Sequence, residues 1–298
     1  MDNERNILAS RVGITGIICN FALFILKIVI GIISKSHAMI ADSLNSAGDV
    51  FASFMTWLGN RISSVPNDED HNYGHGKAEY IFSMLIGISM IVVAIKLLYD
   101  SVMSIIVGNE LIFSWKLVIV SIITIITKLI LYLYTRIVYK KSDNLLVKSN
   151  MLDHRNDILL TSLTLLAIIL AYNHIYFFDG VVGIFISIWI MITGIKIFME
   201  SYNVLMDQAI DNDSKKEILN ILKSKKDVKR IGDIYTIPIG YKYILIATIY
   251  VDGKMKTKES HKIADLIEND IKKKILKVEN VIIHIEPFME RRSYGKEK

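Results

Sequence analysis

Two pairs of polar side chains interrupt stretches of sequence that are otherwise apolar. Asn45 and Asp49 are four residues apart, and Asp153 and Asp157 repeat this spacing much later in the chain. Residues four apart on a helix project from the same face, one turn from each other. If the two helices pack together, the four side chains converge as oxygen ligands without nitrogen or sulfur. That donor set is suited to a divalent cation.

The charge of this set favours an ion. Its three carboxylates cannot all stay ionised in one pocket without compensation, because burial and like-charge repulsion both oppose the charged form. A divalent cation offsets two of the three negative charges, and in its place one or more protons bind. Such a site titrates as a coupled unit and releases protons when metal binds. The residues therefore predict metal/proton exchange, the alternative being two unrelated helix-stabilising acid pairs.

Three further polar residues lie in the same stretches. Asp42 is off the shared face near the outer end of its span, where helix capping is favoured. His154 and Arg155 are expected to point away from the face that carries Asp153 and Asp157. We interpret Arg155 as an internal counter-charge and His154 as polar packing, with a proton-relay role as its alternative.

These side chains require elements that cross a membrane. A spanning helix needs about 20 mostly apolar residues. Six stretches qualify as candidate spans, roughly 12–34, 37–58, 78–107, 111–139, 145–172 and 177–199. The second and fifth are weaker in hydropathy because they contain the polar pairs. The third, fourth and sixth are plain apolar spans whose one or two lysines are expected to snorkel from near the helix ends.

Composition divides the chain in two. Of its 35 Lys and Arg residues, 20 follow residue 208, although the chain as a whole is 52% hydrophobic. We therefore predict a six-helix transmembrane domain over 1–208 and a soluble domain over 209–298. A single cysteine, Cys19, excludes a disulfide framework and a cysteine-based zinc site. The lysines of the tail fit a solvated face better than nucleic-acid binding.

Basic residues in short loops predict the orientation. One side of the six spans carries most of the Lys and Arg and the Lys-rich tail. The other side carries Lys35, and its two remaining loops bring no Lys or Arg. This asymmetry predicts a multi-pass protein of the cell (plasma or inner) membrane with both termini in the cytoplasm.

After Asp207 the pattern becomes that of a soluble α/β domain. Asp213 is expected to cap its first helix. The expected elements are a helix to about 223, strands over 231–239 and 243–251 with a turn at 240–242, a helix over about 258–273 and a strand over 281–286. The order α-β-β-α-β is typical of a ferredoxin-like or metallochaperone-like α+β domain with helices on one face of a small sheet.

Three stretches carry a resemblance to a known family. They are SHAMIADSLNSAGD at 36–49, HNYGHGKAE at 71–79 and DHRND at 153–157. The chain resembles the cation diffusion facilitator family along essentially its whole length. The resemblance implies a homodimeric exporter that moves divalent metal out of the cytoplasm in exchange for protons by alternating access. It also implies that the transport site is the set Asn45, Asp49, Asp153 and Asp157.

The residues at this site bear on the choice of metal. Zinc-type members of the family usually carry His at one or two of the four positions, whereas Asn45 and Asp153 resemble the manganese type. Imidazole suits zinc, carboxylate and amide oxygens suit Mn²⁺, and Mg²⁺ is reluctant to lose its water. We predict Mn²⁺ as the main substrate, with Zn²⁺ or Fe²⁺, and also Co²⁺ or Cd²⁺, as alternatives. No cofactor is expected besides the transported metal.

A second candidate metal site lies in the loop between the second and third spans. It consists of Asp68, His71 and His75, whose convergence depends on a turn because Gly74 and Gly76 favour a loop. One carboxylate and two imidazoles suit a borderline metal, and a solvated polar loop is the alternative. The resemblance implies metal binding here, with a regulatory or metal-delivery role.

A third candidate lies in the tail. His284 and Glu286 are two apart on a predicted strand and share a face, and His261 lies on the preceding helix. The resemblance matches these three to some ligands that zinc-type members carry at a dimer contact. Gly232 and Thr248 stand where further His ligands are expected, so a single weaker site and no site are both left open.

The resemblance also matches Lys77 and Asp207 to a charged pair that ties the membrane bundle to the tail near the inner face. Interfacial snorkelling of Lys77 is the alternative.

Two other classes of function compete with transport. A membrane metalloenzyme needs an open metal position and a positioned base, and neither His-Glu-x-x-His nor Gly-x-Ser-x-Gly is present. A non-transporting metal sensor would signal through the tail, but no partner-binding extension is visible. We therefore predict a secondary transporter rather than an enzyme. Its expected partners are divalent metal ions, protons, the lipid bilayer and a second copy of the chain, and no nucleic acid.

Overall fold

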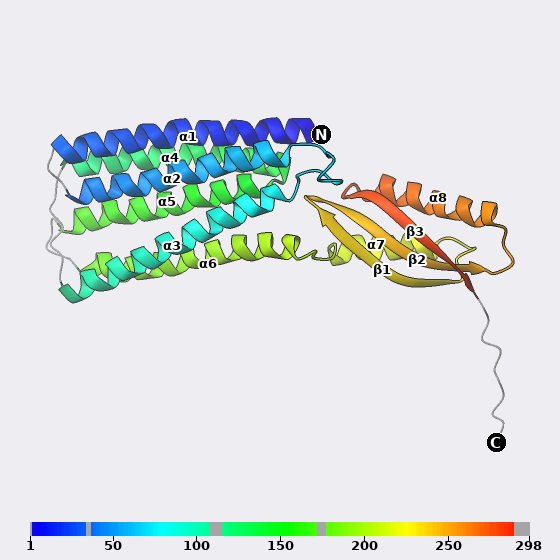
Figure 1. Cartoon of the computed structure of the whole chain (residues 1–298). Coiled ribbons are helices and arrows are strands. Elements are labelled where there is room, and N and C mark those ends of the chain that lie inside the picture. Colours follow the sequence, from blue (N-terminus) through cyan, green and yellow to red (C-terminus); the bar gives the residue numbers. More distant parts are fainter. Residues whose placement is uncertain (1, 34–36, 108–114, 172–176, 289–298) are drawn as a thin grey trace, which may run out of the picture. The chain divides into compact units, whose positions relative to one another are not determined.

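The computed structural model describes residues 2–33, 37–107, 115–171 and 177–288 (Figure 1). The chain divides into two compact units, Met1–Tyr202 and Asn203–Lys298.

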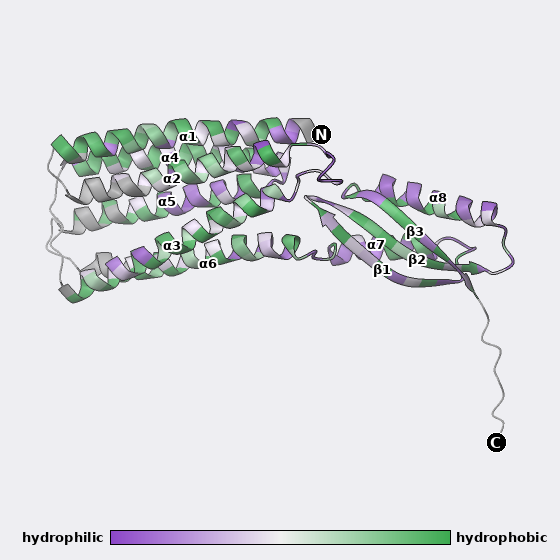
Figure 2. Ribbon diagram, in the orientation of Figure 1, coloured by the Kyte–Doolittle hydropathy of each residue, from purple (hydrophilic) through white to green (hydrophobic). Residues whose placement is uncertain are grey.

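Over its described residues, the first unit consists of six long helices that correspond to the six predicted spans. They are α1 (Asp2–Ile33), α2 (His37–Ser63), α3 (Ala78–Val107), α4 (Trp115–Ser142), α5 (Leu145–Ala171) and α6 (Phe177–Leu205), the last of which ends in the second unit. Figure 2 shows that hydrophobic residues dominate these helices. α2 and α5 carry the polar pairs, and each of them contacts both α1 and α3.

Four helices in the described residues are long and apolar enough to cross a membrane. These spans are Glu4–Ile30, Ala78–Ile106, Trp115–Ser142 and Gly183–Leu205. Within their described residues, α2 and α5 do not meet this test, and charged residues such as Asp49 and Asp153 lie there. Hydropathy alone therefore identifies four spans within the described residues, and it does not identify the two polar helices as spans.

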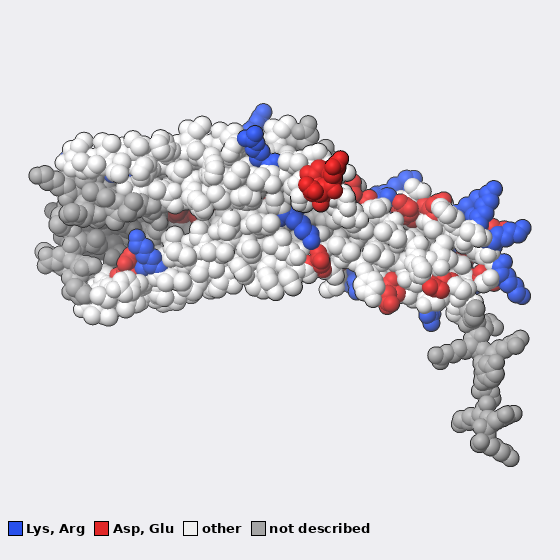
Figure 3. All heavy atoms as spheres, in the orientation of Figure 1, with Lys and Arg blue, Asp and Glu red and all other residues white. Residues whose placement is uncertain are grey.

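The helical unit has an apolar exterior and a partly polar interior. Large hydrophobic side chains such as Phe185 and Trp115 are mostly exposed, whereas Asn20, Asp49 and Lys128 are buried. Figure 3 shows few charged side chains on the visible face of this unit. A large exposed apolar surface marks contact with a membrane or another protein, and the buried polar groups require partners inside the bundle.

Small residues let α1 and α2 approach closely. A Cβ atom added at Gly13 would lie 2.6 Å from the Trp57 Cβ, and one at Gly16 would lie 2.6 Å from the Ser53 Oγ. Glycines at such positions allow helix backbones to approach each other in a membrane. α1 is thereby fixed against the helix that carries Asp49.

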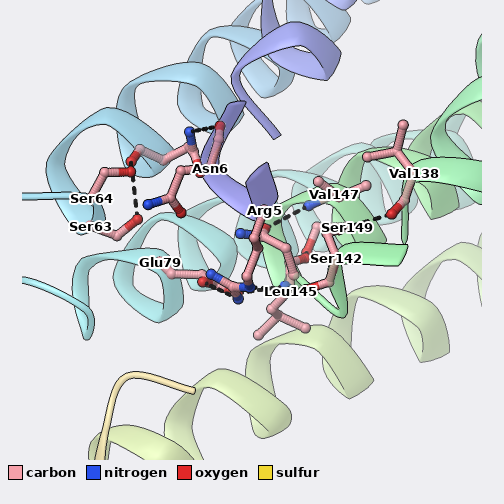
Figure 4. A network of polar contacts seen from close by, with 12 residues as sticks. Arg5, Asn6, Ser63, Ser64, Glu79, Val138, Ser142, Leu145, Val147 and Ser149 are labelled. Carbon is pink, nitrogen blue, oxygen red and sulfur yellow. Dashed lines mark hydrogen bonds and ion pairs between the residues drawn. The ribbon is translucent and has the colours of Figure 1, made fainter. Parts of the chain in front are cut away.

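A buried ion pair joins the ends of four helices (Figure 4). The Arg5 Nη2 atom donates to both carboxylate oxygens of Glu79 at 2.9 and 2.7 Å, and its Nε atom donates to the Ser142 carbonyl at 2.9 Å. Glu79 also accepts from the Leu145 backbone N–H at 2.7 Å. That N–H belongs to the first turn of α5 and has no partner within its own helix. Arg5 and Glu79 therefore link α1 and α3 to the α4–α5 connection.

The second unit confirms the predicted α-β-β-α-β order. Its elements are α7 (Asn212–Lys223), β1 (Arg230–Ile239), β2 (Lys242–Asp252), α8 (Thr257–Lys274) and β3 (Val278–Phe288). The sheet order is β1-β2-β3, with β1 and β2 antiparallel and β2 and β3 parallel.

The start of α7 corrects one prediction. The N-cap is Asp211, whose Oδ1 atom accepts from the Ser214 N–H at 2.9 Å, and the predicted cap Asp213 lies in the first turn. Asp211 has the extended backbone that an N-cap requires. The helix therefore begins two residues earlier than the sequence pattern indicated.

The core of the second unit lies between the sheet and both helices. Alternate β2 residues, among them Leu245 and Ile249, pack with Leu222 of α7 and Ile267 of α8. Because α7 and α8 contribute to this one core, they cover the same face of the sheet. Thr248, between two of these core residues, points to the opposite face.

Candidate metal centre

Three of the four predicted transport-site residues line one cavity in the helical unit. Asp49 of α2 and Asp153 and Asp157 of α5 border a cavity of about 120 Å³. The other lining residues come from α2, α3, α5 and α6 and are mostly apolar, including Ala52, Met90, Val93, Leu160 and Ile190. The cavity thus presents carboxylate oxygens inside an apolar wall, as an ion site within a membrane requires. The side chains of Asn45 and Asp42 lie outside the described part of the structure, so the roles predicted for them are not tested.

The charge that accompanies these acids comes from α4. The Lys128 Nζ atom donates to the Oδ2 atoms of Asp49 at 2.7 Å and Asp157 at 2.6 Å. Its side chain is 1% exposed. The expectation that lysines of this span snorkel from near its ends is therefore wrong for Lys128, which lies near the middle of α4. A lysine at such depth requires an acidic partner, and that signal was available in the sequence.

A second buried lysine lies on α1. Lys27 is 3% exposed and lies within electrostatic range of Asp157. Both lysines thus add positive potential to a site that the sequence pattern presented as purely acidic.

His154 departs from its predicted arrangement. His154 is fully buried, and it places a ring nitrogen within 4.8 Å of carboxylate oxygens of Asp153 and Asp157. It therefore does not point away from these acids, because three residues along a helix return to nearly the same face. Within the described residues, neither ring nitrogen has a hydrogen-bond partner, and Asp49 is not a member of this group of three.

Arg155 contacts neutral groups instead of the acids. Its Nη2 atom lies 3.3 Å from the Thr193 Oγ1 atom and 3.4 Å from the Asn156 Oδ1 atom, and its guanidinium lies 5.3 Å from the centre of the Trp189 ring. The prediction that Arg155 is the internal counter-charge is therefore wrong. Lys128 has that position.

A layer of amides and hydroxyls holds α2 beside its neighbours. The Asn20 Nδ2 atom of α1 donates to the Ser53 Oγ at 3.0 Å and to the Asp49 carbonyl at 3.3 Å. On the other side, the Asn150 Nδ2 atom of α5 donates to Ser53 at 3.4 Å and Thr56 at 3.3 Å. These bonds fix the position of Asp49 along the bundle relative to Asp153, which lies one turn from Asn150.

The loop residues Asp68, His71 and His75 lie together. Their ligand atoms are within 4.8 Å of one another. The Asp68 carboxylate lies 3.2 Å from the His71 Nδ1 and 3.6 Å from the His75 Nε2. The backbone N–H of His71 donates to Asp68 at 2.7 Å, and this bond, with the two imidazoles, holds the pKa of the Asp68 carboxyl below its ordinary value. Asp68 is therefore ionised and available as a ligand at neutral pH.

A tight turn brings these three residues together. Gly74 has a φ angle of 73°, which a glycine adopts without steric cost, and its N–H donates to the His71 carbonyl at 2.9 Å. The His75 N–H donates to the Val65 carbonyl at 3.3 Å. The backbone turn thus brings the three side chains together, which their spacing in the sequence did not determine. Metal binding at this loop stays a prediction.

The tail residues form two separate pairs. His284 Nε2 lies 2.8 Å from Glu286 Oε1 on β3, and His261 Nδ1 lies 3.1 Å from Asp265 Oδ1 on α8. Thr248 is the register partner of His284. Within the described residues, no cluster of three metal ligands includes these histidines, so a metal site in the tail stays a prediction.

The last predicted pair takes one residue from each unit. Lys77 directly precedes α3 and its carbonyl accepts from the Tyr80 N–H at 3.0 Å, while Asp207 follows α6 with a φ angle of 56°. Because the two residues belong to different units, the pairing of their side chains also stays a prediction.

A helical unit with an apolar exterior and buried carboxylates is the architecture of a membrane protein that handles cations. Comparison with known families identifies it further. Residues 13–206 match the cation efflux transmembrane domain, and residues 210–288 match the cytoplasmic domain of cation efflux proteins. The chain belongs to the cation efflux family, also called the cation diffusion facilitator family, and the resemblance seen in its motifs is confirmed.

Three relatives align along most of the chain. The manganese efflux system protein MneP of Bacillus subtilis is 28% identical over 297 residues, which cover 97% of this chain and 100% of MneP. MneS, a second manganese efflux system protein of that organism, is 28% identical over 270 residues, 89% of this chain and 91% of MneS. The magnetosome protein MamB of a Magnetospira strain is 30% identical over 261 residues, 88% of this chain and 89% of MamB.

Proposed function

We propose that this protein exports divalent metal cations from the cytoplasm in exchange for protons, by alternating access, with Mn²⁺ as its main substrate. The transport site is the set Asn45, Asp49, Asp153 and Asp157. The observation that carries the proposal is the buried cavity bordered by carboxylates from both polar helices.

Ligand chemistry and the relatives agree on the metal. Carboxylate and amide oxygens favour Mn²⁺, whereas imidazole favours zinc and other borderline metals. MneP and MneS are manganese efflux proteins. The buried imidazole of His154 beside Asp153 and Asp157 keeps Zn²⁺ and Fe²⁺ as the second candidates.

Proton exchange follows from the charge of the cavity. When the metal leaves, its carboxylates lose a doubly charged partner in a medium where an uncompensated charge is expensive. Protons restore the balance, and their release accompanies the next metal ion. Metal and protons therefore occupy the same carboxylates in turn.

The transport unit comprises residues 1–208, with all six helices crossing the membrane and both termini in the cytoplasm. α2 and α5 are polar, but α1, α3 and α4 pack against them, so their acids need not face lipid. Residues 209–298 form a cytoplasmic domain through which two copies associate. The loop site of Asp68, His71 and His75 delivers metal or regulates transport, and His261, His284 and Glu286 form at most one weak site at the dimer contact.

Transport into proteoliposomes under an imposed pH gradient tests the proposal. The purified full chain is expected to transport Mn²⁺ and to release protons when metal is added. Asp157→Asn should abolish transport, because it removes a charged ligand. Asp100→Asn is a matched control, since Asp100 is an exposed acid on α3.

Two results would contradict the proposal. Parental Mn²⁺ transport by Asp157→Asn would exclude this cavity as the transport site. Zn²⁺ transport at full rate with negligible Mn²⁺ transport would overturn the assignment of the metal. A metal sensor that does not transport would show no metal flux, and Asp49→Ala would then abolish only its signalling.

A further inference from the structure

Lys128 binds the carboxylates that the transported metal needs. Its Nζ atom lies between the Oδ2 atoms of Asp49 and Asp157, at 2.7 and 2.6 Å. Within the described residues, Asp153, His154 and Asp157 form a close group that does not include Asp49. Lys128 therefore bridges the acid of α2 and the acids of α5. The acids of the two polar helices are thus joined through a cation that belongs to the protein.

We propose that Lys128 is a tethered cation that competes with the divalent metal for Asp49 and Asp157. This inference rests on the proposed transport site. A metal that took both carboxylates would place a double positive charge beside the Lys128 ammonium in a medium of low dielectric, where like charges repel strongly. Metal binding therefore requires that the ammonium leave at least one of the two aspartates. When it returns, it displaces the metal and promotes release.

α4 offers a second position for the displaced ammonium. Thr124 lies one turn before Lys128, on the same face of the helix. Its side chain is 1% exposed, and its Oγ1 atom has no hydrogen-bond partner in the described part of the chain. The lysine side chain has four rotatable carbons and three donors, so its ammonium can move toward this hydroxyl without leaving the interior. Thr124 and the aspartates are then alternative partners of one cation.

Transport kinetics of Lys128→Met separate competition from structural support. Removal of the competing ammonium is expected to lower the KM for Mn²⁺ about tenfold, which corresponds to the loss of one charge-assisted hydrogen bond. The maximal rate should fall as well, because release slows. Lys128→Arg keeps the charge and is expected to retain a KM near that of the parent. Lys96→Met, which removes an exposed lysine of α3, is the matched control.

The Thr124→Val variant tests the second position of the ammonium. Without the hydroxyl, the ammonium stays on the aspartates more of the time, so the KM for Mn²⁺ is expected to rise several-fold. In Lys128→Met the same substitution should have no further effect, because the two residues act through one interaction. Thr124→Val retains every charged residue, so it still tests the competition if Lys128→Met does not fold.

The outcomes distinguish this inference from the proposed function. If Asp157→Asn abolishes transport but Lys128→Met folds with an unchanged or raised KM, the competition is refuted and the transport site stands. An unchanged KM in Thr124→Val refutes the second position. If the parent protein transports no metal or Asp157→Asn transports at the parental rate, the proposed function itself has failed.

Discussion

Oxygen ligands set the chemistry of the buried site at the scale of single residues. Asp49, Asp153 and Asp157 border one cavity, and Asn45 is the fourth predicted ligand. Lys128 adds a fixed positive charge to them. At the proposed transport site, the metal preference is expected to depend on which atom type each position supplies, and the strength of binding on the cation that holds two of the carboxylates.

Replacement of Asn45 tests whether the donor type determines the metal. Asn45→His supplies an imidazole, which favours Zn²⁺ over Mn²⁺. The ratio of Zn²⁺ to Mn²⁺ transport in proteoliposomes is expected to rise about tenfold or more, since one ligand exchange is worth on the order of 1.4 kcal/mol or more. Asn45→Gln keeps the amide and is the control. An equal ratio in both variants would show that another feature selects the metal.

The loop site gives a second prediction for single residues. Asp68→Asn removes the negative charge of the ligand, while the length and polarity of the side chain stay similar. It is expected to abolish metal binding at the loop, measured as loss of one Mn²⁺ or Zn²⁺ site by titration calorimetry of the full chain. Asp70→Asn, two residues away and exposed, is the matched control. Retention of the full number of metal sites in Asp68→Asn would argue for a solvated polar loop.

At the scale of elements, helix ends and helix contacts determine where Asp49, Asp153 and Asp157 lie. Small residues bring α1 against α2, and Asn20 and Asn150 join α2 to its neighbours. Arg5 and Glu79 then fix the ends of α1 and α3 to the start of α5. These contacts hold α2 and α5 at one level, where Lys128 reaches an acid of each helix.

The Arg5–Glu79 pair is expected to be important for stability. Arg5→Ala leaves the Glu79 carboxylate buried without its charged partner, which costs about 3–5 kcal/mol. The unfolding midpoint of the purified protein in detergent should fall clearly. Lys148→Ala breaks the more exposed Lys148–Glu200 pair and should cost less than about 1 kcal/mol. Equal effects of the two substitutions would contradict this assignment.

The cap of α7 provides a pH-dependent prediction. The Ser214 N–H holds the pKa of the Asp211 carboxyl below its ordinary value. Because the folded pKa is lowered, the stabilisation is complete above the ordinary range of Asp and is lost as pH falls through the lowered pKa. Asp211→Ala should cost about 1 kcal/mol at neutral pH, seen as faster amide hydrogen exchange in α7. Asp213→Ala, outside the cap, should change exchange less.

At the scale of the whole molecule, the chain consists of two units. The helical unit holds the cavity, the α/β unit provides the proposed dimer contact, and Lys77 and Asp207 are the pair predicted to couple them. A coupling of this kind would affect the rate of transport more than the folding of either unit.

Substitution of this pair tests the coupling. Lys77→Ala is expected to lower the transport rate while the amount of folded protein stays near normal. Lys77→Asp should lower it further, and Lys77→Asp combined with Asp207→Lys should restore part of the rate, because the opposite charges are again paired. Loss of folded protein in Lys77→Ala, or no recovery in the double variant, would indicate structural support instead.

The sequence by itself determined which elements exist and which residues carry the chemistry. Hydropathy and helical spacing act over a few residues, so they located six helices, the acids of α2 and α5 and the α-β-β-α-β order of the tail. The family resemblance depends on the same local motifs. Even the errors at this level were small, such as the cap of α7 at Asp211 instead of Asp213.

Only the tertiary structure decided which charges meet. Lys128 lies on a helix whose own sequence is apolar, and its partners are on two other helices, so no local pattern contains the contact. The same is true of Arg5 and Glu79, which lie on α1 and α3. Burial forces each of these charged groups to find a partner, but packing selects which one it finds.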